Sequence, residues 1–134
     1  MNIARTPPSG DELASMYTDA GWINAPNPEI MTRSVESGSE WFVARDEYGS
    51  ALGIGRVITD YARYAFIVDV IVLAKHRSAG IGTAIMNEII SECRSLGIDS
   101  VNLWPSIGKV PFYEKLGFYA LPPEQPHMKL KRAI

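Results

Sequence analysis

The chain has 134 residues, of which 46% are hydrophobic and 21% charged, and its formal net charge is −2. This composition predicts one globular domain over residues 1–134, and the small charge gives no reason to expect nucleic acid or a membrane as a partner. No apolar run is long enough to span a membrane. The single cysteine, Cys93, permits no internal disulfide and, with a polar N-terminus that carries no leader, predicts a cytoplasmic protein.

The first part of the chain predicts two helices and a hairpin. Residues 9–20 are expected to form a helix that Ser9 or Asp11 caps, and residues 29–37 to form a second helix. The inward-facing side chains of these helices are expected to be Leu13, Met16, Tyr17, Ile30, Met31 and Val35. Two apolar runs, residues 41–45 and 51–59, flank a glycine-bearing turn and therefore predict an antiparallel hairpin.

The second part alternates strands and helices. Residues 64–73 are nearly all apolar, which predicts a central strand, and residues 80–96 show helical spacing that ends at Gly97. The strand expected over residues 100–104 follows that helix, and such a crossover makes it parallel to the strand before the helix. A short helix (110–116) and a last hairpin (118–121 with 127–131) complete an α/β fold. Its sheet is expected to be mixed and mostly antiparallel, with a parallel strand pair in the middle and flanking helices.

A basic, glycine-bearing turn connects the third strand to the long helix. It reads Arg-Ser-Ala-Gly-Ile-Gly from Arg77 to Gly82. At such a turn unpaired N–H groups converge, the helix dipole is positive, and glycine lets a phosphate approach the backbone. The turn therefore predicts a site for a phosphorylated molecule. The residues after Gly82 fit neither a P-loop nor a dinucleotide fingerprint, which disfavours a nucleotide-binding module.

Two motifs in this order resemble the GNAT superfamily of N-acetyltransferases. The R-x-x-G-x-G pattern of Arg77 to Gly82 resembles the coenzyme A pyrophosphate loop of that family. The sequence PFYEKLGF, from Pro111 to Phe118, resembles its C-terminal F-Y-x-K-x-G-F signature. The resemblance covers residues 41–131 and implies an acyl-CoA N-acyltransferase fold. In that fold the central parallel strands splay apart, and acetyl-CoA is the acyl donor.

The resemblance also assigns contacts with acetyl-CoA. The backbone of Val70, Ile71 and Val72 is expected to pair with the pantetheine amides. The pyrophosphate is expected to bind the main-chain N–H groups of the glycine turn, which consists of Arg77, Ser78, Ala79, Gly80, Ile81, Gly82 and Thr83. The Arg77 side chain would add positive charge there, and its alternative is an exposed charge on the surface.

Three residues of the second motif region complete the expected donor site. Ser106 stands where the family often has an Asn that contacts pantetheine, and a hydroxyl replaces only part of the hydrogen bonding of an amide. Lys109 stands where the family often has Ala, and it reaches a phosphate or faces solvent. Phe112 lies beside the family tyrosine, Tyr113.

Acyl transfer to an amine needs a deprotonated amine, a donor for the oxyanion, and a proton or donor for the leaving thiolate. A main-chain N–H near Val72 is expected to serve the oxyanion. Tyr113 matches the family tyrosine whose hydroxyl approaches the coenzyme A sulfur, and its alternative is a core aromatic. Asp69 is the candidate base, because burial raises the pKa of an unpaired carboxyl group. Its alternative is a structural carboxylate paired with Arg56 on the adjacent strand.

Other candidates carry less of the prediction. Glu40 and Asp60, at strand ends, are weaker candidates for the base, and proton transfer through ordered water needs no dedicated base. Trp22, in the loop between the first two helices, either contacts the substrate amine or packs in the core. Neither His76 nor His127 has a partner at metal-ligand spacing, so no metal site is expected.

The sequence thus predicts an acetyl-CoA-dependent N-acetyltransferase. It would move an acetyl group to a primary amine of a small molecule or a peptide, by direct attack in a ternary complex. The alternative is a non-catalytic acyl-CoA-binding or regulatory domain of the same fold. A homodimer is expected, by analogy with small members of the family and because an exposed C-terminal hairpin favours pairing between strand edges.

Overall fold

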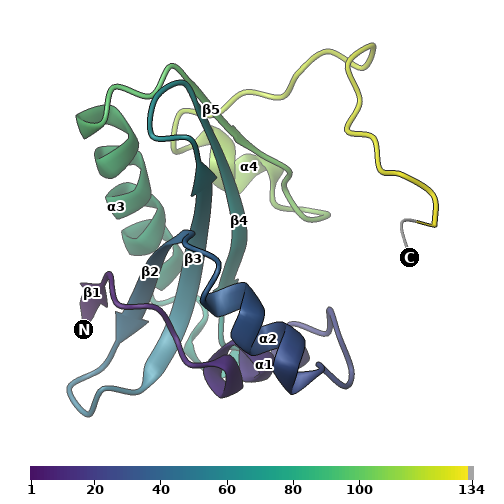
Figure 1. The fold of residues 1–134 in the computed structure, drawn as a ribbon. Helices are drawn as coiled ribbons and strands as arrows, with labels where there is room; N and C mark the ends of the chain where they lie inside the picture. Colours follow the sequence, from purple (N-terminus) through teal and green to yellow (C-terminus); the bar gives the residue numbers. More distant parts are fainter. Residues whose placement is uncertain (133–134) are drawn as a thin grey trace. The chain divides into compact units, whose positions relative to one another are not determined.

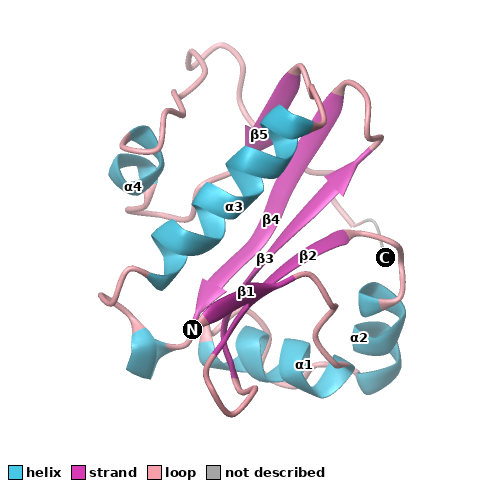
Figure 2. Ribbon diagram, turned by 90° about the vertical axis from the view of Figure 1, so that its left-hand side faces the viewer, coloured by secondary structure: helices cyan, strands magenta, loops and turns pink. Residues whose placement is uncertain are grey.

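The computed structural model describes residues 1–132, in two compact units that meet in sequence between Leu103 and Trp104. The first unit contains the whole sheet and the three longer helices (Figures 1 and 2). Its elements are β1 (Asn2–Ala4), α1 (Gly10–Asp19), α2 (Pro28–Val35), β2 (Glu40–Arg45), β3 (Ala51–Thr59), β4 (Tyr64–Val72), a 3-10 turn (Ala74–His76), α3 (Ile81–Ser95) and β5 (Ser100–Leu103). The second unit has one short helix, α4 (Val110–Glu114).

The sheet has the strand order β1-β2-β3-β4-β5, and only β4 and β5 are parallel. This pairing confirms the mixed sheet and the crossover through α3. The parallel ladder runs from Tyr64 opposite Ser100 to Ile67 opposite Leu103, and β4 continues beyond it without a partner on that side in residues 1–132. The pair lies at the edge of the described sheet and not in its middle, because no strand follows Leu103 within those residues.

The two faces of the sheet carry different helices, with α3 on one side and α1 and α2 on the other (Figure 1). Register explains the division, since Trp41 lies opposite Arg56, and Val43 opposite Ile54, on the face that α1 covers. The core on this face consists of Leu13, Met16, Tyr17, Met31, Trp41, Val43, Ile54 and Ile71. Burial of such apolar surface is the main stabilising term of a domain.

Helix α1 begins at a complete capping box. The Ser9 hydroxyl accepts from the Glu12 N–H at 3.0 Å, and the Glu12 carboxylate accepts from the Ser9 N–H at 2.9 Å. Ser9, not Asp11, is therefore the cap. The same carboxylate binds Arg45 of β2 at 2.7 Å, which fixes the start of α1 against the sheet.

On the opposite face, α3 approaches β3 closely because glycine stands where a side chain would collide. A Cβ atom at Gly55 would lie 2.7 Å from Ile85 Cγ2 and 2.8 Å from Ile89 Cδ1. Cys93 belongs to the same buried helix face, and burial raises the pKa of its thiol. Cys93 is therefore a packing residue of this helix face.

One strand was missed and two expectations differ from the structure. Strand β1 was not predicted, since three residues are too few to show a period. Ile30 was expected inward, but 49% of it is exposed, because α2 turns only Met31 fully into the core. The hairpin of residues 118–121 with 127–131 is wrong, since neither segment is a strand. Pro122, Pro123 and Pro126 interrupt the segment, and proline has no N–H for a ladder.

No helix in residues 1–132 has both the length and the apolar character needed to cross a membrane.

Candidate functional site

Strand β4 carries a bulge at its centre. The register passes from Arg56 opposite Val68 to Ile54 opposite Ile71, so that Asp69 and Val70 together lie opposite Gly55. Asp69 has a φ of 54°, in the left-handed region. The bulge lies just past Ile67, where pairing with β5 ends, so the second half of β4 presents backbone groups that are not paired on the β5 side within the described residues. These groups belong to the stretch predicted to bind pantetheine.

The glycine turn has the backbone conformation of an anion site. Ser78 and Gly80 both have positive φ, at 65° and 81°, and Gly80 is the N-cap of α3. The first helical bond runs from the Ala84 N–H to the Gly80 carbonyl, which leaves the N–H groups of Ile81, Gly82 and Thr83 without an acceptor in the helix. An α3 of 15 residues adds its positive N-terminal dipole.

The Arg77 side chain, predicted to add charge near the phosphates, has two contacts within the chain. Its Nε donates to the Val72 carbonyl at 3.1 Å, and its Nη2 lies 4.0 Å from an Asp19 oxygen. The same Asp19 oxygen accepts the Ala74 N–H at 2.8 Å. Arg77 therefore joins the end of β4 to the end of α1, and 52% of its side chain stays exposed.

Asp69 is paired, as the structural alternative required. The Tyr17 hydroxyl donates to Asp69 Oδ2 at 2.8 Å, and Arg56 Nη1 lies 3.5 Å from the same oxygen. The other oxygen, Oδ1, accepts no hydrogen bond from residues 1–132. The role of Asp69 as the base stays a prediction.

Arg56 is the basic residue that faces the Asp69 carboxylate. It is 9% exposed and stands over the Trp41 ring, with its guanidinium carbon 4.8 Å from the ring centroid. It donates to Ser34 Oγ at 2.7 Å, to the Ser34 carbonyl at 3.0 Å and to Ser37 Oγ at 2.9 Å. Arg56 therefore connects the bulge of β4 to the C-terminal end of α2.

Tyr17 is a site residue that the sequence analysis placed only in the core. Its ring packs there, while its hydroxyl reaches Asp69. Burial first, and then the Asp69 charge, raise the pKa of this hydroxyl, so it remains a proton donor at neutral pH. A tyrosine in an apolar helix stripe is the signal that was available, because a buried hydroxyl needs a partner.

Trp22 stacks on Tyr17 from the loop after α1. The ring centroids lie 5.9 Å apart with an interplanar angle of 29°, and the main-chain N–H of Trp22 donates to the Tyr17 carbonyl at 3.0 Å. The residue is 48% exposed. It is thus held in place without being buried, which leaves its predicted contact with a substrate open.

The weaker base candidates have other roles. Glu40 binds Arg5 at 2.7 Å and accepts a short hydrogen bond from the Tyr61 hydroxyl. Asp60 accepts from three backbone N–H groups of the following turn, and these bonds lower the pKa of its carboxyl group. Both carboxylates thus have partners in the folded chain, and the role of either as a base stays a prediction.

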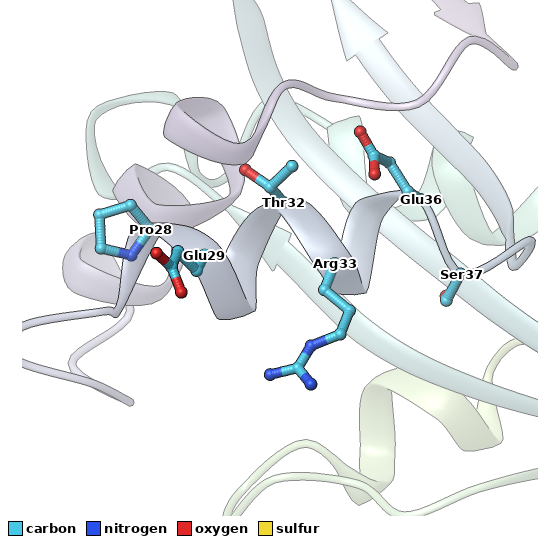
Figure 3. A pocket seen from close by; sticks show the side chains of 6 residues that line it. All are labelled: Pro28, Glu29, Thr32, Arg33, Glu36 and Ser37. Carbon is cyan, nitrogen blue, oxygen red and sulfur yellow. The ribbon is translucent and has the colours of Figure 1, made fainter.

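A shallow hollow of about 650 Å³ follows the outer side of α2 (Figure 3). Its lining residues are Pro28, Glu29, Thr32, Arg33, Glu36 and Ser37. None of the predicted site residues belongs to this lining. Figure 3 shows Arg33 projecting away from Glu36, so the hollow has no convergent set of polar groups.

The second unit presents the other predicted residues. In α4 the Tyr113 ring has edge contacts with Phe112, at 5.0 Å between centroids, and Phe118, at 6.1 Å. Burial raises the pKa of the Tyr113 hydroxyl, which is bound to no residue in the described chain. The Ser106 main-chain carbonyl accepts from the Lys109 main-chain N–H in a turn at Gly108, and both residues are exposed. Because burial raises its pKa, the Tyr113 hydroxyl is protonated at neutral pH and able to donate.

No group of His, Cys, Asp and Glu side chains within residues 1–132 is arranged to hold a metal ion.

The model of the acetyltransferase (GNAT) family matches residues 4–118, most of the chain. The chain belongs to the GNAT family of acetyltransferases. This match extends the resemblance to the first forty residues. The GNAT chain is also similar in fold to a probable acetyltransferase of unknown function from Staphylococcus aureus, with a TM-score of 0.85 and 21% identity over 97% of this chain and 98% of that one.

Two relatives show how far sequence similarity reaches. An uncharacterized N-acetyltransferase of Pyropia yezoensis is 25% identical over 109 residues, which are 80% of this chain and 63% of the relative. A glucosamine 6-phosphate N-acetyltransferase of Trypanosoma brucei brucei is 44% identical over 54 residues, 40% of this chain and 37% of the relative. The GNAT chain thus spans under two thirds of the length of these relatives.

Proposed function

We propose that the chain transfers an acetyl group from acetyl-CoA to a primary amine of a small molecule or peptide, by direct attack in a ternary complex. The observation that carries the proposal is the turn before α3. Positive φ at Ser78 and Gly80 and the acceptor-less N–H groups of Ile81, Gly82 and Thr83 suit a pyrophosphate.

The second half of β4 supports the same donor. Pairing with β5 stops at Ile67, so backbone groups of Val70, Ile71 and Val72 are available for the amides of pantetheine. The Val72 carbonyl is engaged by Arg77 in this structure, and binding through that carbonyl requires the Arg77 side chain to move. Thr83, Ser106, Lys109 and Phe112 are proposed as further contacts of the donor.

The chemistry divides between two groups. The amine nitrogen attacks the thioester carbon, the C–S bond breaks, and the thiolate takes a proton from the Tyr113 hydroxyl, which burial keeps protonated. The ammonium loses one proton to water or to Asp69 before it attacks, and the second proton, which the nitrogen releases as the amide forms, returns through water to the Tyr113 oxygen. A main-chain N–H of the β4 bulge, next to Val72, is proposed to stabilise the oxyanion.

The acceptor is an amine, and the amino sugar phosphate in the name of the trypanosomal relative is one candidate among several. A non-catalytic acyl-CoA-binding domain is the second candidate, since Arg56 holds the carboxylate expected to act as base. A homodimer is proposed by analogy with small members of the family, and a cytoplasmic location because the single cysteine fits a reducing compartment.

The experiment measures thiol release from acetyl-CoA with a panel of amines. Tyr113→Phe should lower kcat by about a hundredfold to ten-thousandfold while calorimetry shows unchanged binding of acetyl-CoA, because proton transfer contributes about 10²–10⁴ to such rates. Tyr119→Phe is the matched control, since Tyr119 lies nearby in sequence and is 81% exposed. Tight binding without turnover of any amine favours the second candidate, and an absence of binding refutes both.

A further inference from the structure

The contacts around Asp69 form a continuous series of polar and aromatic groups in the first unit. Trp22 stacks on Tyr17, and the Tyr17 hydroxyl donates to Asp69 Oδ2, which Arg56 also faces. The two donors fix one carboxylate oxygen and leave Oδ1 without a partner in residues 1–132. The Asp69 side chain is 14% exposed, so it is reachable over a small area.

The charges in this region are already balanced. Arg56 lies 3.5 Å from Asp69, and Arg77 lies 4.0 Å from Asp19. The Nη atoms of Arg56 are committed to Ser34, Ser37 and Asp69, and its Nε is buried. Among residues 1–132, no cationic side chain in contact with the Trp22–Tyr17–Asp69 series therefore has its charge available for a phosphate. A ligand that brings a second charge, such as a phosphate, would be desolvated there without compensation.

We infer that Asp69 Oδ1 and the exposed Trp22 ring form the acceptor subsite, and that its ligand is a primary ammonium on an apolar, preferably aromatic, body without phosphate. The ammonium donates a charge-assisted hydrogen bond to Oδ1, and the body packs on the indole, whose position Tyr17 fixes. Tyr17 is a positioning residue, because its hydroxyl orients the carboxylate and does not touch the amine. The inference rests on the proposed function and names its substrate class.

The subsite also gives Asp69 a role that its contacts allow. Tyr17 and Arg56 both engage Oδ2, so Oδ1 is left for an ion pair with an ammonium. The ammonium proton then leaves to water once the amine is placed at the thioester. This reading accounts for the carboxylate that faces both Tyr17 and Arg56.

The test compares 2-phenylethylamine, spermidine and glucosamine 6-phosphate as acceptors at saturating acetyl-CoA. We expect phenylethylamine to have the highest kcat/KM. Trp22→Ala should raise its KM about threefold to tenfold, the range of an aromatic contact, and Trp22→Phe should restore most of it. Asp69→Asn should raise KM about tenfold to a hundredfold. Tyr48→Phe is the control, since its side chain is 84% exposed in the turn after β2.

A direct binding readout separates this inference from the proposed function. Calorimetry with phenylethylamine and the protein alone should give a Kd that Asp69→Asn weakens by the same factor, and Tyr17→Phe by less. A higher kcat/KM for glucosamine 6-phosphate, unaffected by Trp22→Ala, would overturn the subsite while acetyl transfer stands. Failure of acetyl-CoA to bind, with amine binding intact, would refute the proposed function alone.

Discussion

Removal of the Arg56 side chain is expected to be one of the most destabilising single changes in this protein. Arg56→Met keeps an unbranched side chain of similar length for packing on Trp41 but cannot donate. It loses three hydrogen bonds to Ser34 and Ser37, each with a net contribution of about 1 kcal/mol. It also leaves the Asp69 charge, 14% exposed, without its cation, which costs about 1–3 kcal/mol more.

The total expected loss is therefore about 4–6 kcal/mol, a large part of the free energy of unfolding of an ordinary domain. Urea unfolding at pH 7, followed by circular dichroism, measures it, and an unchanged m-value shows that the two variants unfold from comparable states. Asp69→Asn in the Arg56→Met background should recover about 1–3 kcal/mol, because the buried charge is then absent.

The double-mutant cycle decides whether the charge pair matters. If the losses of unfolding free energy caused by Arg56→Met and by Asp69→Asn sum to that of the double variant within about 0.5 kcal/mol, the two groups do not interact and the reasoning is refuted. Arg56→Lys offers a second check, because an ammonium keeps the charge but lacks the geometry to donate hydrogen bonds to Ser34 and Ser37 together.

Three further changes test separate features. Gly80→Val should weaken acetyl-CoA binding and destabilise the fold by about 1–2 kcal/mol, because the φ of 81° at this position disfavours a branched side chain. Gly49→Val, also at positive φ, is the control and should leave acetyl-CoA binding unchanged. If calorimetry shows equal losses of acetyl-CoA binding for the two variants, the turn is not part of the donor site. Gly55→Val should destabilise by about 1–3 kcal/mol, since its side chain would meet Ile85 and Ile89, and thermal melting that shows no loss would mean that α3 moves away freely. The hydrogen bond from Arg45 lowers the pKa of Glu12, so the stability that this ion pair contributes is present above the unfolded pKa of about 4.3 and is lost as the pH falls through the folded pKa. Glu12→Gln and the unmodified chain should therefore differ in free energy of unfolding at pH 7 and converge only in acid. A difference that stays constant from pH 7 to pH 3 would contradict this.

The fold was predictable where the signal is local. The apolar spacing of α3, the turn between β2 and β3 and the capping Ser9 are each encoded within a few residues, and the observed elements follow them closely. The last hairpin failed because alternation of apolar residues is necessary for a strand but not sufficient. Within the described residues, this segment has no strand pairing, and its prolines cannot donate to a ladder. Its large apolar side chains are exposed; they are Tyr119, Leu121, Met128 and Leu130.

The site was predictable in its motifs but not in its partners. The glycine turn is a continuous stretch, and Gly80 readily adopts the positive φ that precedes α3. The partner of Asp69 lies 52 positions away in sequence at Tyr17, and no local pattern reports such a contact. Arg56 was foreseen as an alternative partner only because adjacent antiparallel strands bring residues of similar offset together.

The backbone at Asp69 also limits how this protein can change. A φ of 54° is tolerated by aspartate, asparagine and glycine, but it is costly for glutamate and more so for branched side chains. Few amino acids are therefore open to this position, whatever reaction selection favours. A lineage that needed a longer carboxylate there would first have to remove the bulge, and with it the interruption of the β4 ladder opposite Gly55. The strand geometry thus restricts the chemical repertoire of the site more tightly than the surrounding side chains do.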